Sequence, residues 1–140
     1  MVDPSRGPSY LFGGSAVANI ETSLKEAMAI DGAIGVALVD YTSGLTLGVM
    51  GGAPIMDMNI AAAGNTDVVR AKVRTLEMLG LDDSIEDILI TLDSQYHLIR
   101  LLKSRRGGDA LFLYLSLAKN RANLGLARHQ LRKIESDLEV

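Results

Sequence analysis

Apolar side chains recur at intervals of three and four residues in three separate stretches of the chain. Because an α-helix has about 3.6 residues per turn, this spacing places them on one side of a helix. The pattern predicts helices over residues 15–30, 57–78 and 122–137. Asp57 is positioned to cap the start of the second helix, and Gly80 to end it.

Shorter apolar stretches lie between these helices and are bounded by glycine, serine and aspartate, as is typical of β-strands joined by turns. Residues 32–48 predict a hairpin of two strands. Residues 85–92, 96–103 and 110–117 predict three more strands, and the short connections between them indicate an antiparallel meander.

The last of these strands is apolar on both faces. Its odd-numbered residues from 111 to 117 are leucines, whereas Phe112 and Tyr114 point to the opposite face. Both faces therefore need a cover of helices. We expect an α+β fold in the order helix, two strands, helix, three strands, helix, with a mostly antiparallel five-stranded sheet and helices on both faces.

The turn of the predicted hairpin has its own signature. Gly44 stands where a short hairpin loop needs a residue with positive φ, which glycine adopts without strain. Asp40, at the end of the first strand, can accept hydrogen bonds from backbone N–H groups of the turn. The segment is built to shape a sheet, and its residues form no catalytic or metal-binding motif.

Gly64 lies inside the second predicted helix, where glycine costs about 1 kcal/mol relative to alanine. Two explanations are open. Either the helix breaks there and Thr66 caps a second segment, or the missing side chain lets another backbone approach closely. We favour close approach.

Composition narrows the choice of partners. The net charge of −3 gives no basic field for nucleic acid, and an aromatic content of 4% leaves few rings for base stacking. The longest apolar run, residues 110–118, is about half the length of a membrane-spanning helix, so we expect no membrane insertion. The absence of cysteine fits a cytoplasmic location. Residues 1–14, rich in proline and glycine, predict a flexible lead-in to a single domain over residues 15–140.

Candidate catalytic and ligand-binding residues are scarce. His97 and His129 are the only histidines and lack metal-ligand spacing. No G-x-S-x-G or phosphate-binding glycine motif occurs, so we expect no enzyme, no cofactor and no metal. Glu86 and Asp87 are expected to protect an edge strand from unwanted pairing. Arg70 and Arg74 share one face of the second helix, which is either a solvated surface or a patch that contacts an acidic partner.

Three features together resemble the Roadblock/dynein-light-chain domain family, which includes bacterial regulators of Ras-like GTPases. The first is the apolar strand that ends in Asp40 and is followed by Gly44 and Leu45. The second is the order of elements after it. The third is the stretch NLGLAR, residues 123–128, which leads into the last helix directly after the last strand. The resemblance covers residues 15–138, and the Gly64–Asp67 stretch departs from the family pattern.

The resemblance implies a profilin-like sheet with the first and last helices on one face and the second helix on the other. It also implies a homodimer formed through the second helix and the third strand, and a surface on the paired helices that binds a Ras-like small GTPase. The residues placed at the dimer interface are Ala63, Gly64, Ile88, Leu89, Ile90 and Thr91. Those placed at the GTPase-binding surface are Arg70 and Arg74.

The primary hypothesis is therefore a non-catalytic homodimeric scaffold that modulates the nucleotide cycle of a small GTPase. The alternative is a profilin-like or PAS-like domain that senses a small molecule. No convergence of polar groups on an apolar pocket is visible in the sequence, which counts against the alternative.

Overall fold

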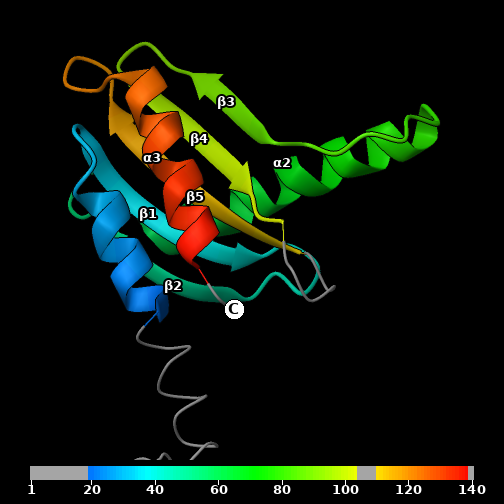
Figure 1. Cartoon of the computed structure of the whole chain (residues 1–140), viewed down its shortest axis with the longest axis horizontal. Helices are drawn as coiled ribbons and strands as arrows, with labels where there is room; N and C mark the ends of the chain where they lie inside the picture. Colours follow the sequence, from blue (N-terminus) through cyan, green and yellow to red (C-terminus); the bar gives the residue numbers. More distant parts are fainter. Residues whose placement is uncertain (1–18, 104–109, 139–140) are drawn as a thin grey trace, which may run out of the picture.

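The computed structural model describes residues 19–103 and 110–138. A five-stranded antiparallel sheet carries helices on both faces (Figure 1). A helix over residues 19–28 comes first. The other elements are β1 (Ala33–Asp40), β2 (Thr46–Gly51), α2 (Met58–Met78), β3 (Asp87–Thr91), β4 (Gln95–Leu101), β5 (Leu111–Ala118) and α3 (Leu124–Asp137). The predicted segment 1–14, the start of the first helix and the turn at 104–109 lie outside the described residues.

The strands are arranged in the order β2-β1-β5-β4-β3. The hairpin and the meander are joined by the pairing of β1 with β5, and every pair of neighbours is antiparallel. This confirms the predicted α+β fold and leaves β2 and β3 at the two edges of the sheet.

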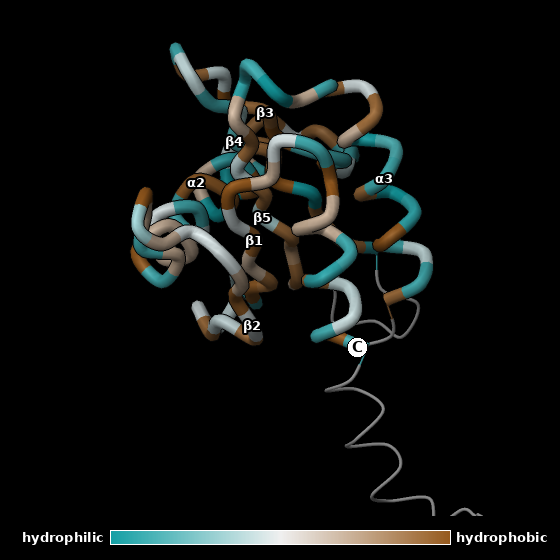
Figure 2. Tube along the Cα trace, turned by 90° about the vertical axis from the view of Figure 1, so that its left-hand side faces the viewer, coloured by the Kyte–Doolittle hydropathy of each residue, from teal (hydrophilic) through white to brown (hydrophobic). Residues whose placement is uncertain are grey.

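Two apolar cores lie on opposite faces of the sheet. Leu113, Leu115 and Leu117 belong to the core beneath the N-terminal helix and α3, whereas Phe112 and Tyr114 belong to the core beneath α2. Figure 2 shows the layers from the side, with α2 on one side of the strands and α3 on the other. The prediction of helices on both faces is confirmed.

The ends of the elements follow the predicted local signals. Asp57 accepts hydrogen bonds from the first-turn N–H groups of Asn59 and Ile60, 2.8 and 3.3 Å away. Gly80 follows α2 with a φ of +69°, as a helix-ending glycine does. The Asp57 side chain and the Gly80 backbone therefore set the limits of α2 through local effects.

The turn between β1 and β2 also forms as predicted. The φ of Gly44 is +80°. Asp40 Oδ1 accepts hydrogen bonds from the N–H groups of Thr42 and Ser43, at 2.9 and 3.2 Å. The turn is therefore held by its own residues.

Helix α2 runs through Gly64 without a break, so the alternative of two helical segments is wrong. The side chains of Asn65 and Thr66 donate back to the carbonyls of Ala61 and Ala62, each at 2.8 Å, which keeps these polar groups satisfied inside the helix. A Cβ placed on Gly64 would meet no atom within 4 Å. Within the described residues, no second backbone approaches this glycine.

Candidate functional site

Arg70 reaches from α2 to the hairpin turn. Its guanidinium donates to the carbonyl oxygens of Tyr41 and Thr42, at 2.5 and 2.9 Å. The Arg70 side chain is exposed, but two of its donors are bound to backbone of the same chain and are therefore not free for a partner in this arrangement. The sequence does not reveal this contact, because every residue has a backbone carbonyl and the acceptors therefore cannot be recognised from residue type.

The outward surface of α2 has two sides that differ in chemistry. Helical spacing puts one group of exposed residues on the side that faces the hairpin and solvent, which we call the Arg74 face: Ala63, Asp67, Arg70 and Arg74. It puts another exposed group roughly 100–160° around the helix from Arg70, which we call the Gly64 flank: Gly64, Val68, Ala71 and Thr75. Because the Arg70 side is turned toward the hairpin turn, the Gly64 flank is turned toward the β3 side of the sheet. Ala63 and Gly64 therefore lie on different sides of the helix.

Strand β3 has one open edge within the described residues. Leu92 N donates to Gln95 O at 2.8 Å and Leu101 N donates to Glu86 O at 3.2 Å. The backbone N–H and C=O groups of the even-numbered residues in this segment therefore point toward β4. In an antiparallel pair the intervening residues direct their N–H and C=O groups the other way. Asp87, Leu89 and Thr91 thus present donors and acceptors to the outside of the sheet.

The side of β3 and β4 that faces the α2 layer is incompletely covered. Helix α2 packs mainly against β1 and β2, and in Figure 1 it crosses behind the sheet without following β3. Ile88, Ile90 and His97 remain half-buried there. An apolar strip therefore continues from the open edge of β3 across this face.

Two ion pairs hold α3 on the opposite face. Arg128 makes two hydrogen bonds to the carboxylate of Asp87, at 3.1 and 3.2 Å. Glu135 accepts from Arg100 Nε at 2.8 Å, and its second oxygen accepts from Lys103 N at 2.8 Å. Asp87, expected to protect the strand edge with its charge, is instead turned onto α3 and neutralised there.

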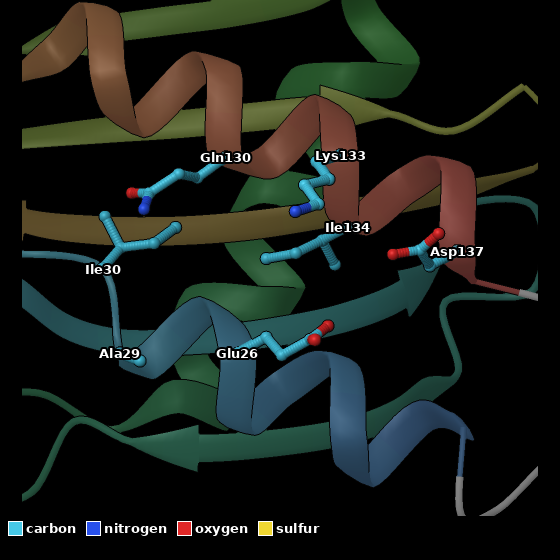
Figure 3. A pocket seen from close by; sticks show the side chains of 7 residues that line it. All are labelled: Glu26, Ala29, Ile30, Gln130, Lys133, Ile134 and Asp137. Carbon is cyan, nitrogen blue, oxygen red and sulfur yellow. The ribbon is translucent and has the colours of Figure 1, made fainter.

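A shallow cleft separates the C-terminal ends of the N-terminal helix and α3 (Figure 3). Its volume is about 210 Å³, and its apolar lining is formed by Ala29, Ile30 and Ile134. Glu26 and Asp137 face each other at one end of it. The exposed residues around the cleft make no hydrogen-bonded cluster that would orient a ligand, so the cleft lends the small-molecule hypothesis little support.

Candidate chemistry elsewhere is sparse. In the part of the chain that the structure describes, no three histidine, aspartate or glutamate side chains gather as a metal site would require. His97 and His129 lie apart, the first on β4 and the second exposed on α3. No helix among residues 19–103 and 110–138 combines the length and apolarity needed to cross a membrane.

Comparisons by sequence give no match, either to a protein-family model or to a curated protein. Solved structures do match. MglB from Myxococcus xanthus aligns with a TM-score of 0.71 at 18% identity, over 87% of this chain and 86% of that one. The Roadblock/LC7 domain from Streptomyces avermitilis aligns with a TM-score of 0.67 at 12% identity, over 81% of this chain and 88% of that one.

The chain has the Roadblock/LC7 fold. The gliding protein MglB from Thermus thermophilus supports the same assignment, with a TM-score of 0.71 at 15% identity and 89% of each chain covered. The fold expected from the resemblance is thereby confirmed. In this fold the open edge of β3 lies next to a half-buried apolar strip of the sheet, and the outward surface of α2 is exposed.

Proposed function

We propose that the chain is a non-catalytic homodimeric scaffold of the cytoplasm that binds a Ras-like small GTPase and modulates its nucleotide cycle. The observation that carries the proposal is the open edge of β3 lying beside an incompletely covered sheet face and the Gly64 flank of α2. A second copy of the chain offers the same three features, which is what a two-fold interface requires.

The first part of the proposed interface is backbone pairing. Leu89 is the central residue of β3, with Asp87 and Thr91 on either side. Two copies related by a two-fold axis near Leu89 would align antiparallel, so that the outward N–H and C=O groups of these residues bond each other. The two sheets would then continue as one, and Ile88 and Ile90 would be enclosed beneath it.

The second part is helix packing. On the Gly64 flank, Gly64 and Ala71 leave room for a second helix, and Val68 is 36% exposed. The partner's α2 could therefore lie close to this flank and cover the strip of Ile88 and Ile90. The missing side chain of Gly64, which no other backbone among the described residues of the single chain approaches, would allow the partner's helix to pack closely.

The Arg74 face would remain on the outside of such a dimer. Arg74 is exposed, and the described residues provide it with no hydrogen bond or ion pair. Arg70 is occupied by the hairpin, so Arg74 is the better candidate for contact with an acidic surface of a GTPase. A pair of such arginines, one per copy, would steer a partner electrostatically.

The chain contributes no coupled nucleophile and base among its described residues, and we therefore place the chemistry on the GTPase. A scaffold can change the rate of GTP hydrolysis by holding the GTPase's own switch residues in a productive geometry.

The test is a pull-down with small GTPases from the source organism, each loaded with GDP or a non-hydrolysable GTP analogue. The Arg74→Glu variant is compared with Arg132→Glu, which reverses an exposed charge on α3 at the other face. We expect binding that Arg74→Glu weakens and Arg132→Glu preserves. If no GTPase binds in either nucleotide state, the regulatory function is refuted; if both variants bind like the original chain, Arg74 is not at the contact.

A further inference from the structure

His97 lies on the part of the sheet that α2 leaves open. It is half-buried on β4, directly opposite Ile90 of β3, and its ring meets the ring of Tyr114 edge-on with centroids 5.4 Å apart. Its Nε2 is 2.7 Å from Gln95 Oε1. Since the amide oxygen only accepts, Nε2 carries the hydrogen in this contact.

The partners of His97 in the strand register are uncharged. Ile90 of β3 and Ser116 of β5 are its partners in the strand register. On these strands and on β4, the charged residues Asp87 and Arg100 belong to the opposite face, where each pairs with α3. Burial lowers the pKa of His97, so its environment already favours the neutral ring.

The charged residues of α2 point away from the core to solvent: Asp67, Arg70, Lys72, Arg74 and Glu77 are all exposed. Asp67 and Lys72 lie about equally far around the helix from the centre of the Gly64 flank, on opposite sides of it, and a partner helix that turns its Lys72 side to the covered strip brings an ammonium group there. A nearby ammonium group opposes protonation of a histidine. Asp67 lies on the other side of the flank, on the Arg74 face.

We infer that His97 makes dimerisation sensitive to pH, so that two copies separate as it gains a proton. The inference rests on the proposed dimer. Covering His97 with a partner helix removes water from the ring, which disfavours the charged form more in the dimer than in the monomer. By linkage, a state that binds fewer protons is weakened as the pH falls. The dimer dissociation constant should therefore rise on acidification.

The experiment is sedimentation equilibrium between about pH 8 and about pH 5.5, a range in which histidine titrates and most carboxylates do not. The chain has two histidines, which supplies a matched control. His97→Gln and His97→Phe keep a neutral side chain at the site, whereas His129→Gln removes the exposed histidine of α3. The phenylalanine variant also keeps an aromatic ring against Tyr114, in case glutamine disturbs folding.

For the original chain and His129→Gln, we expect the dissociation constant to rise roughly tenfold or more across this range, the size of a change that histidine protonation commonly produces. Both His97 variants should lose most of this dependence. Three outcomes would overturn the pH inference while leaving the proposed dimer intact. The dissociation constant does not change with pH, it decreases on acidification, or it changes equally in the His97 variants. A chain that is monomeric at about pH 8 overturns the dimer and this inference with it.

Discussion

Arg70 joins two elements that are distant in the sequence. Its bonds to the Tyr41 and Thr42 carbonyls fix the hairpin turn to α2. Arg70→Ala should lower the free energy of unfolding by about 1 kcal/mol, because the side chain is exposed and its bonds compete with water. Arg70→Lys should recover only part of this, since an ammonium lacks the planar fork of donors.

Urea unfolding measures the free energy of unfolding, and amide exchange in residues 41–45 reports on the turn. Arg74→Ala is the control, because it removes an arginine from the same helix without a bond to the hairpin; its effect should stay within about 0.5 kcal/mol. Equal effects of the two alanine variants would show that the hairpin contact contributes nothing.

Glu135 holds a more deeply buried cation. Arg100 is 8% exposed in its side chain and Glu135 is 13% exposed. Glu135→Gln leaves the guanidinium without its counter-charge, and we expect a loss of about 3 kcal/mol in the free energy of unfolding. Asp87→Asn breaks the more exposed pair with Arg128 and should cost about 1 kcal/mol. A larger loss for Asp87→Asn than for Glu135→Gln in urea unfolding would contradict this ranking of the two pairs.

Single residues could be predicted where their partners are near in the sequence. Asp40 and Gly44 carry out their turn roles because the hydrogen-bond donors and the φ requirement are local. The contacts of Arg70 and Glu135 could not be predicted, because each depends on two segments that only the folded chain brings together.

At the scale of elements, Gly64 gives the sharpest prediction. Gly64→Ala should raise helix stability by up to about 1 kcal/mol, because a methyl group there meets nothing in the single chain. It should nevertheless weaken dimerisation, since the methyl group would stand between two closely packed helices. Unfolding of the dilute chain measures the first effect, and sedimentation equilibrium the second.

Gly125→Ala is the matched control for this change. Gly125 also lies in a helix, and its nearest contact for an added Cβ is an ordinary 3.7 Å. It should share any gain in helix stability while leaving dimerisation unchanged. A Gly64→Ala chain that dimerises as well as Gly125→Ala would exclude Gly64 from the interface.

The type and order of the elements followed from hydrophobic periodicity, which depends only on which face is buried. The predicted helix over residues 57–78 also forms without a break at Gly64, where tertiary packing and the bonds of Asn65 and Thr66 back to the helix outweigh the local cost of glycine. Helix propensity alone could not exclude a break at Gly64, and the folded chain has none.

The whole molecule should respond to its own concentration if two copies associate. Mass action predicts that a tenfold increase in concentration stabilises the folded dimer by about 1.4 kcal/mol, which corresponds to a rise of roughly 2–6 °C in the melting temperature. Differential scanning calorimetry over a concentration series measures this. A melting temperature independent of concentration, with a monomer mass by light scattering, would contradict the dimer.

A mostly antiparallel five-stranded sheet with helices on both faces could be predicted from the order of elements, whereas the strand order and the surfaces of the proposed interface could not. The open edge depends on which strand is outermost in the folded sheet. The direction in which the Gly64 flank points depends on how α2 is rotated about its axis, which the Arg70 contact with the hairpin indicates. The resemblance to the Roadblock family indicated the second helix and the third strand as the expected interface. The bonds of Arg70 to the hairpin are the reason that the proposed GTPase contact is assigned to Arg74.

Neutralisation of Asp87 by Arg128 has a consequence for solubility. Strand β3 reads DILIT, contains no proline and has no free charge once Asp87 is paired. An unpaired edge of this composition is a template for aggregation. For newly made chains, dimerisation would then compete with aggregation. The amount of soluble protein in a cell would depend on the rate of assembly as well as on the stability of each folded chain.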